Sequence, residues 1–177
     1  MFLGASALLS RVLGLVRDHL LASNFGALSG EGLFDLDTYY AAFRLPDLLF
    51  NLLVFGTLSA AFVPIFVGYL KDDKKEDAFK FSSAILNLSV LLIAVIAGLI
   101  FIFAPWIIPL YVPGFDAEKL KLTVDVTRII LIAPVFFTIS GVLQGIQNGF
   151  KTFFYYSLAP IIYNLSIIAG IIFLSPK

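Results

Sequence analysis

The chain contains few of the residues from which catalytic and metal sites are usually built. Its 177 residues include no cysteine and a single histidine, His19. Without cysteine there are no disulfides, no thiolate catalysis and no cysteine-ligated zinc or iron–sulfur sites, and one histidine offers little for any other transition metal. The sequence therefore offers no thiol for catalysis, and we expect no metal site and no cofactor.

Charge is also scarce. Charged residues make up 14% of the chain, and 12 basic side chains balance 12 acidic ones, so nothing suggests a nucleic-acid partner. Hydrophobic residues make up 60%, and the mean hydropathy is +0.99. Soluble domains have about 45–50% apolar and about 25% charged residues. Such a chain cannot cover its surface with polar groups, so we expect membrane lipids to be its solvent.

Long stretches of the chain contain no charge at all. Four uncharged runs of at least 22 residues occupy Leu48–Leu70, Phe81–Phe115, Ile129–Phe150 and Thr152–Pro176. A helix needs about 20 apolar residues to cross a hydrocarbon core of about 30 Å, so each run is long enough to span a bilayer. The N-terminal stretch is a fifth helical candidate, because its charges lie too far along it for a signal peptide.

These patterns predict an all-α fold, a polytopic membrane helical bundle in a single transmembrane domain over residues 1–177. The five predicted spans are about 1–24, 36–62, 80–104, 120–148 and 152–175. Within the second span, Pro46 should kink the helix and Pro64 should turn it toward the membrane interface. The loop 70–80 carries four lysines, which places this loop and the N-terminus in the cytoplasm by the positive-inside rule.

The first two spans contain ionisable residues, which are costly in a bilayer and so should face a cavity or a partner. With 100° per residue, the second span places four polar residues within about 80° of one another. These residues are Asp37, Arg44, Asp47 and Asn51. Arg44 and Asp47 are three residues apart, close enough to pair and neutralise each other.

The first span carries Arg11 and Asp18 on one face and Arg17 about 120° away. Because consecutive helices tend to be neighbours, we expect the two charged spans to bring both arginines close to Asp37 and Arg44. Guanidinium groups bind phosphate and carboxylate in a bidentate manner, so such a cavity predicts an anionic, phosphate-bearing substrate. The alternative is that the charges pair with one another, as Arg17 and Asp18 can, and only fix helix packing.

Small and amide side chains mark the later spans. Gly141, Gly145 and Gly149 recur at every fourth position, which lets a second helix approach closely. Polar neighbours of this stripe leave a water-lined path as the alternative. Asn87 and Asn164 are expected to form interhelical hydrogen bonds rather than to bind a ligand.

Three stretches of the sequence resemble one known family. They are SRVLGLVRD (Ser10–Asp18), DTYYAAFRLPDLLFNLLVFGTLSAAFVPIF (Asp37–Phe66) and GVLQGIQNGFKTFFYYSLAPIIYNLSIIAG (Gly141–Gly170). The first two resemble the opening of the MurJ/MviN family, and the third resembles its fourth and fifth helices. These are lipid II flippases of the multidrug/oligosaccharidyl-lipid/polysaccharide exporter superfamily.

The resemblance implies two helical lobes around a cationic cavity in the bacterial inner membrane. It implies transport of lipid II, the undecaprenyl-pyrophosphate-linked peptidoglycan precursor, from the inner to the outer leaflet by alternating access, with no enzyme activity. Arg11 and Arg17 match the first-helix arginines that engage the pyrophosphate, and Asp37 matches the acidic residue that begins helix two. Phe50 stands where the family commonly has an arginine, and Arg44, two turns earlier, is expected to compensate in part.

The length fits about one lobe, so we expect the N-terminal lobe of a flippase, with a C-terminal lobe, lipid II and membrane lipids as partners. The predicted substrate-binding residues are Arg11, Arg17, Asp37, Arg44, Asp47 and Asn51. Three other functions stay open: export of another polyprenyl-linked polysaccharide precursor, a non-transporting membrane scaffold, and an intramembrane enzyme acting on polyprenyl phosphates. That enzyme would need carboxylates holding magnesium on one helix face, whereas Asp35 and Asp37 diverge on a helix.

Overall fold

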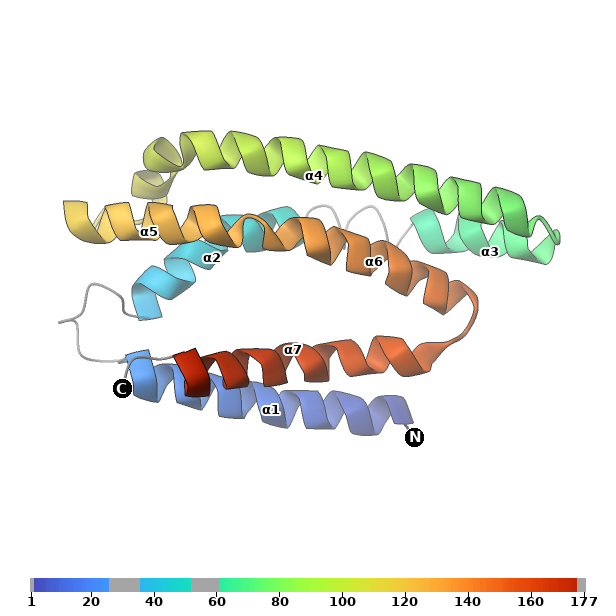
Figure 1. Cartoon of the computed structure of the whole chain (residues 1–177), viewed down its shortest axis with the longest axis horizontal. Helices are drawn as coiled ribbons and strands as arrows, with labels where there is room; N and C mark the ends of the chain where they lie inside the picture. Colours follow the sequence, from blue (N-terminus) through green and yellow to red (C-terminus); the bar gives the residue numbers. More distant parts are fainter. Residues whose placement is uncertain (1, 26–35, 52–60, 175–177) are drawn as a thin grey trace. The chain divides into compact units, whose positions relative to one another are not determined.

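The computed structural model describes residues 2–25, 36–51 and 61–174, and all regular structure in these ranges is helical (Figure 1). The helices are α1 (Phe2–Phe25), α2 (Leu36–Phe50), α3 (Val63–Lys71), α4 (Lys75–Tyr111), α5 (Ala117–Ile130), α6 (Ala133–Gly149) and α7 (Phe153–Leu174). Two predicted segments lie outside the described residues. They are the loop between the first and second predicted spans, which contains Asp35, and residues 52–60 of the second predicted span.

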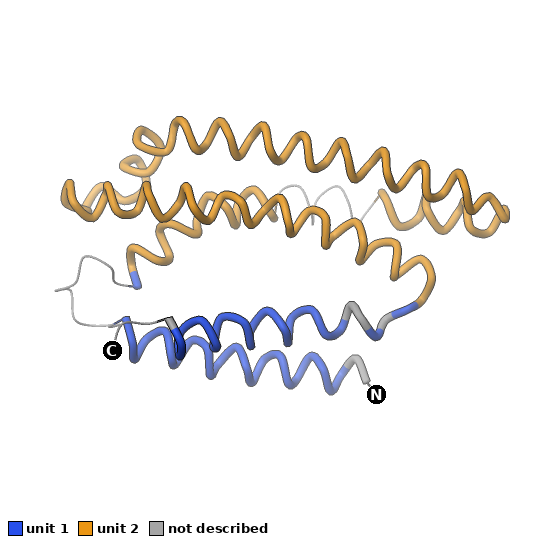
Figure 2. The backbone as a smooth tube through the Cα atoms, viewed as in Figure 1, with its two compact units in different colours: residues 1–36, 152–177 blue, residues 37–151 orange. Residues whose placement is uncertain are grey.

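The helices form two compact units (Figure 2). Residues 1–36 and 152–177 form the unit that contains α1 and α7, and residues 37–151 form the unit that contains α2 to α6. In the first unit, α1 and α7 lie side by side and run in the same direction (Figure 1). Their buried residues include Ser6, Leu21, Ser157, Asn164 and Ile171. Small and polar side chains at such a contact let the two backbones approach closely.

In the second unit, α4 packs against α5 and α6, which run in the opposite direction, and α3 packs against both α4 and α6 (Figure 1). Three apolar clusters follow α4 from its start to its end. Their buried members include Phe66, Ala78 and Val142 in the first, Leu49, Ile93 and Leu131 in the second, and Ala104, Ile108 and Val124 in the third. Because lipid tails are as apolar as leucine, close packing rather than exclusion of water holds such clusters together in a membrane.

Helix α4 continues through Pro105 and ends at Tyr111, beyond the predicted end of the third span at 104. Proline has no N–H, so Pro105 leaves the carbonyl of Phe101, four residues earlier, without its helical donor. Arg128 of α5 supplies a replacement, because its Nε donates to that carbonyl at 3.1 Å. The guanidinium also lies 5.0 Å from the centroid of the Phe101 ring. The helix therefore tolerates the proline through a contact with its neighbour.

The two earlier prolines occupy different positions. Pro46 lies buried inside α2, and Pro64 lies in the first turn of α3, which agrees with the predicted break there. The chain then reverses between α3 and α4, where Asp73 has a φ of 58°, a left-handed conformation that aspartate tolerates. The lysine-rich loop predicted at 70–80 is therefore a short turn flanked by helix on both sides.

The predicted fourth span, 120–148, is not a single helix. It is interrupted at Leu131 and Ile132, between α5 and α6. Pro134 explains the break, because it cannot donate to the Ile130 carbonyl and is well accommodated in the first turn of α6. The two helices continue in nearly the same direction (Figure 1), and together they are long enough to cross a membrane. This break lies inside the predicted fourth span, and the crossing of the membrane by this stretch stays a prediction.

The glycine stripe of α6 is a packing surface for two aromatic rings. A β-carbon at Gly145 would lie 2.7 Å from Cδ1 and Cε1 of Phe62, and one at Gly149 would lie 2.5 Å from Cδ1 of Phe66. Both rings are buried, and Phe62 stacks on Phe66 and on Phe81, so neither ring has room to withdraw. The packing interpretation is confirmed for these two glycines.

Gly145→Ala should therefore destabilise the protein by about 1–3 kcal/mol, the usual cost of overpacking a buried contact. Gly98→Ala in α4 is the matched control, since a β-carbon there meets nothing within 4 Å. Removing a glycine from this helix interior should stabilise the protein by about 0.5–1 kcal/mol. Thermal unfolding of both purified variants in one detergent measures the two effects, and shifts of the same sign would contradict the assignment.

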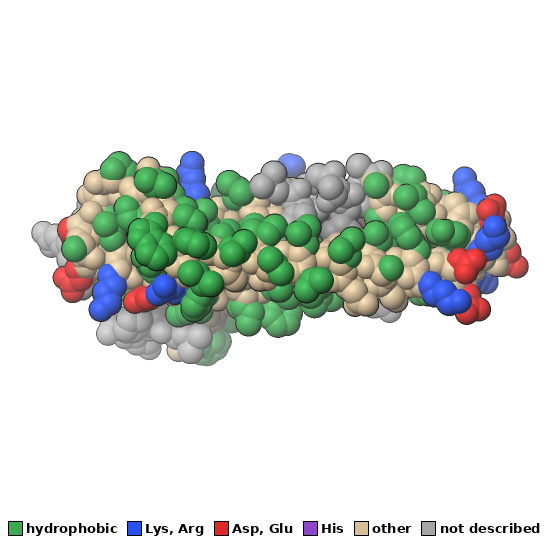
Figure 3. Space-filling view, turned by 90° about the horizontal axis from the view of Figure 1, so that it is seen from above, with side chains coloured by type: hydrophobic (Ala, Val, Ile, Leu, Met, Phe, Trp, Pro, Cys, Tyr) green, Lys and Arg blue, Asp and Glu red, His purple; other side chains and the backbone are tan. Residues whose placement is uncertain are grey.

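The surface along α4 is apolar. Large exposed side chains on this helix include Leu88, Leu91, Val95, Leu99 and Ile102. In Figure 3, charged side chains gather around the turn between α3 and α4 and around the opposite end of α4, with hydrophobic side chains between them. Helix α4 and the α5–α6 stretch are both long and apolar enough to cross a bilayer. The all-α membrane helical bundle is confirmed, and the number of crossings stays a prediction.

Candidate functional site

Arg17 of α1 is held by three hydrogen bonds. Its Nε and Nη2 donate to one carboxylate oxygen of Asp18 at 3.0 and 2.8 Å, and its Nη1 donates to Oδ1 of Asn164 at 3.0 Å. The side chain is only 26% exposed. The pairing of Arg17 with Asp18, which the sequence suggested, is confirmed, and the additional bond attaches this arginine to α7.

Asn164 of α7 forms hydrogen bonds to Arg17 and to the backbone of both α1 and α7. Its Nδ2 donates to the backbone carbonyl and the hydroxyl of Ser10 at 3.1 and 3.2 Å and to the carbonyl of Pro160 at 3.0 Å. Asn164 is 6% exposed. Its predicted interhelical hydrogen bond is confirmed. The bond to Arg17 was missed, because no sequence signal shows which faces of α1 and α7 meet.

Arg11 differs from Arg17. It lies exposed on α1, and no ion pair or hydrogen bond joins it to any other residue in the described ranges. Arg11 and Arg17 are six positions apart in the sequence, which places them about 120° apart around the helix, so only Arg17 faces α7. Arg11 therefore keeps all of its N–H donors available for a ligand.

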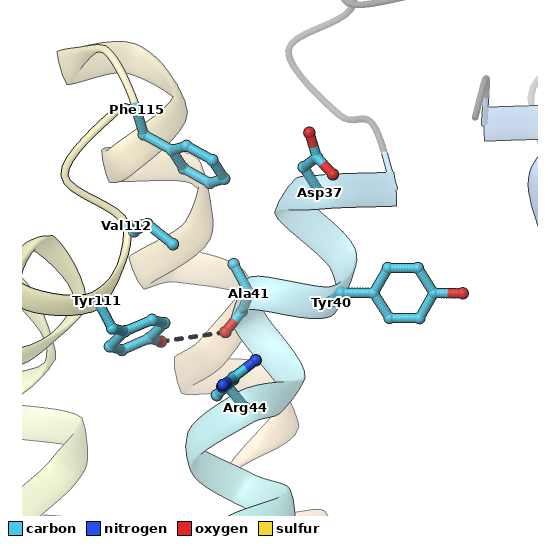
Figure 4. A pocket seen from close by; sticks show the side chains of 7 residues that line it. All are labelled: Asp37, Tyr40, Ala41, Arg44, Tyr111, Val112 and Phe115. Atoms are coloured by element: carbon cyan, nitrogen blue, oxygen red, sulfur yellow. Dashed lines mark hydrogen bonds between the residues drawn. The ribbon is translucent and has the colours of Figure 1, made fainter. Parts of the chain in front are cut away.

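The predicted polar face of α2 lies on the exposed side of its unit. Asp37, Arg44, Asp47 and Asn51 are all exposed. The buried side of α2 carries Thr38, Ala41, Ala42, Pro46 and Leu49. Within the described part of the chain, Arg44 and Asp47 form no ion pair, so their predicted pairing was wrong. Arg44 instead lies near Ala41 and Tyr111 (Figure 4). An ion pair between Arg44 and Asp47 at this exposed surface would in any case have stabilised the helix very little.

A pocket of about 300 Å³ lies beside the first two turns of α2. It is lined by Asp37, Tyr40, Ala41 and Arg44 from α2 and by Tyr111, Val112 and Phe115 from the end of α4 and the segment after it (Figure 4). The Tyr111 hydroxyl donates to the Ala41 carbonyl at 3.0 Å and closes one wall. Asp37 and Arg44 are seven residues apart, about 10 Å along the helix. The pocket therefore has a carboxylate toward one end and a cation toward the other.

Lys119 of α5 is the cation nearest to Asp37. Its Nζ lies 4.0 Å from Oδ2 of Asp37 and 4.3 Å from the centroid of the Phe115 ring. The Lys119 side chain is 18% exposed and that of Asp37 is 79% exposed, so the contact is long and open to solvent on one side. Lys119 was missed in the sequence, because its place in the first turn of α5 does not show which helix that turn meets.

The two groups of charged residues belong to different units. Arg11 and Arg17 lie in the unit of α1 and α7, and Asp37 and Arg44 lie in the unit of α2 to α6. Their convergence on one substrate stays a prediction. Over the described ranges, no group of three or more histidine, aspartate or glutamate side chains is arranged to hold a metal ion.

The chain that carries these arginines matches one protein family over most of its length. A family model described as "Lipid II flippase MurJ" matches residues 22–177. The chain belongs to the MurJ family of lipid II flippases. This membership confirms the resemblance seen in the sequence and makes the protein a member of a membrane-transporter family.

Individual MurJ proteins support the assignment. The lipid II flippase MurJ of Burkholderia cenocepacia is 36% identical over 177 residues, which cover 96% of this chain and 32% of that protein. The lipid II flippase MurJ of Thermosipho africanus is 33% identical over 168 residues, covering 95% of this chain and 33% of that protein. The probable lipid II flippase MurJ of Thermotoga maritima is 34% identical over 167 residues, covering 93% of this chain and 33% of that protein. The chain spans about a third of the length of these MurJ relatives.

Phe50 marks the departure from the expected MurJ pattern. Its ring centroid lies 5.1 Å from that of Phe137, and the side chain packs against the first apolar cluster. The position therefore contributes to packing between α2 and α6. An arginine there would bring a charge into this apolar contact, so the difference affects both the packing and the charge of this region.

Proposed function

We propose that this protein works in lipid II flipping. It moves the undecaprenyl-pyrophosphate-linked peptidoglycan precursor from the inner to the outer leaflet of the bacterial inner membrane by alternating access. The observation that carries the proposal is that α1 of a MurJ-family chain holds Arg17 by hydrogen bonds and leaves Arg11 exposed, with no bonding partner in the described ranges. Translocation makes and breaks no covalent bond, so no catalytic residue is required. The helices described here form part of the path, and a C-terminal lobe is the expected partner.

The two arginines have different tasks in this proposal. A guanidinium has five N–H donors, and Arg17 uses three of them on Asp18 and Asn164. The remaining donors are held in a fixed direction, which lowers the entropy cost of binding a ligand. Arg11 adds a second, mobile guanidinium. Both can form charge-assisted bonds to the pyrophosphate oxygens, which are the strongest hydrogen bonds available in a site of low dielectric.

We also assign the exposed face of α2 a part in the proposed transport. The contact between Asp37 and Lys119 is long, so Asp37 can exchange it for another cation as the cavity opens and closes. Arg44 supplies a cation that compensates in part for Phe50. Asp47 on α2 and Asn51, which directly follows α2, extend the polar face by about one and two turns beyond Arg44.

The membrane orientation is testable because the chain has no cysteine, so a single introduced cysteine is the only thiol. The proposed multi-pass topology has a cytoplasmic N-terminus and a cytoplasmic turn between α3 and α4. Asp77→Cys near this turn should resist an impermeant thiol reagent in intact cells and react after permeabilisation. Gly114→Cys, after α4 and free of steric contacts, should react in intact cells. The opposite pattern would reverse the topology.

The function is tested by complementation. The protein, expressed as its gene encodes it in a strain depleted of its own lipid II flippase, should restore growth and cell shape. Vesicles that contain the purified protein should also move fluorescent lipid II between leaflets. Failure of both assays with normal amounts of membrane-inserted protein would refute the proposal. A non-transporting scaffold would then be the remaining interpretation.

Export of another polyprenyl-linked polysaccharide precursor is the second candidate. It is favoured by one observation, the apolar Phe50–Phe137 contact at the position where the family commonly has an arginine. The same vesicle assay discriminates between the two. Movement of an undecaprenyl-pyrophosphate-linked glycan other than lipid II, without movement of lipid II, would support the second candidate and overturn the first.

A further inference from the structure

The charges around the pocket beside α2 favour a ligand that carries both a positive and a negative group. Arg44 has no ion-pair partner in the described residues and stands toward one end. The carboxylate of Asp37 lies toward the other end. The Asp37 side chain is 79% exposed, and Nζ of Lys119 is 4.0 Å from Oδ2 of this carboxylate. A pyrophosphate carries only negative charge, so Asp37 would repel it. Asp37 and Arg44 together therefore favour a ligand group in which a cation accompanies the phosphate, in addition to any part these residues play in transport.

The size of the pocket restricts the ligand further. Its volume of about 300 Å³ lies at the lower limit of the roughly 300–1,000 Å³ of pockets that enclose drug-sized ligands. A single phosphate with a short amine fits such a space. A disaccharide that carries a peptide does not.

The surroundings of the pocket are typical of the boundary between a membrane and water. Trp106 is 66% exposed on α4, and Tyr111 and Phe115 follow it at the pocket wall. Tyrosine and tryptophan gather at the depth of lipid headgroups, where lysines close to them reach the aqueous phase. Lys119 and Lys121 occupy this end of α5. If α4 crosses the bilayer, the pocket lies where phospholipid headgroups lie.

We propose that the pocket formed by α2 and the end of α4 binds the phosphoethanolamine headgroup of a membrane phospholipid. The phosphate contacts Arg44, and the primary ammonium donates hydrogen bonds to the carboxylate of Asp37. A choline headgroup has the same net charge but no N–H to donate, and a glycerol headgroup has no cation, so both bind less well. The proposal rests on the membrane placement of α4 and not on the identity of the transported lipid.

Native mass spectrometry of the purified protein measures the preference directly. The protein is incubated with equal amounts of short-chain phosphatidylethanolamine, phosphatidylcholine and phosphatidylglycerol, and the bound lipids are counted. The unaltered protein should retain phosphatidylethanolamine in excess. Asp37→Asn should bind phosphatidylethanolamine with a smaller preference over phosphatidylcholine, because the amide oxygen is a neutral and therefore weaker acceptor for the ammonium. Arg44→Gln should bind all three lipids about tenfold less, the loss expected for one charge-assisted hydrogen bond.

Two variants serve as matched controls. Glu118→Gln and Lys121→Gln remove one charge of each sign from exposed positions on α5 outside the pocket, and both should keep the preference. Circular dichroism confirms that every variant retains its helix content. Asp37→Asn with an unchanged preference, or Arg44→Gln that binds as Lys121→Gln does, would overturn the proposal. Complementation of a flippase-depleted strain is scored separately, so failure of the lipid site and failure of the transport function are distinguishable.

Discussion

Replacement of Arg11 and Arg17 by glutamine together should abolish growth of a flippase-depleted strain that depends on this protein, with the protein still present in the membrane. A hydrogen bond to a charged group contributes about 1.5–3 kcal/mol. Loss of two such contacts therefore weakens binding of the pyrophosphate roughly a hundredfold or more. Growth and flipping of fluorescent lipid II measure the loss, and immunoblots of membrane fractions measure the amount of protein.

The single variants separate the two arginines. Arg17→Gln removes the bonds to Asp18 and Asn164 and should lower thermal stability as well as activity. Arg11→Gln should lower activity alone, because Arg11 has no bonding partner in the described ranges. Arg11→Lys should retain part of the activity, and Arg17→Lys should retain less, since a single ammonium does not reproduce the planar fork of the guanidinium.

The charge-matched control is the double variant of Lys71 and Lys75 to glutamine, which removes two positive charges beside the turn between α3 and α4. It should grow normally, because those lysines flank the turn between α3 and α4 and have no part in the proposed binding of the substrate. Normal growth of the double arginine variant would contradict the proposed role of both residues.

Asn164→Leu should destabilise the contact between α1 and α7 and also reduce transport. The substitution keeps the size of the side chain and removes the acceptor for Arg17 and the donors to Ser10 and Pro160. Interhelical hydrogen bonds in membranes average about 0.6 kcal/mol, and a bond to a charged group contributes about 1.5–3 kcal/mol. The total loss should be about 2–4 kcal/mol, visible as a lower unfolding temperature in detergent.

A second variant separates positioning from stability. Asn164→Asp keeps an acceptor for Arg17 but loses the amide donors, so it should lose stability while retaining more transport per molecule than Asn164→Leu. Asn87→Leu is the control, because Asn87 is an exposed asparagine in α4 and should tolerate the change. Equal transport per molecule in Asn164→Leu and the unaltered protein would show that Asn164 has no role beyond packing.

The sequence by itself determined that the protein lies in membrane lipid, that its fold is helical, and which residues share a face of one helix. Apolar runs of 22 residues or more without charge predict membrane helices, because a helix satisfies every backbone group within its own segment in lipid. The four-residue repeat of glycine predicted close packing, which Phe62 and Phe66 confirm. The period of 3.6 residues placed Asp37 and Arg44 on one face of α2, and the structure leaves both exposed there. Each of these features is local to one helix.

Only the tertiary structure decided which side chains meet. Arg17 was expected to pair with its neighbour Asp18, and Asn164 was not expected to bind it. Asp37 was expected to lie close to the arginines of the first span, and within the described residues its ion pair is with Lys119. These contacts join positions far apart in the chain, and they depend on the rotation of each helix about its axis and on its choice of neighbour. Apolar helices with similar faces share many possible packings, so the choice rests on the whole set of close contacts rather than on any one segment.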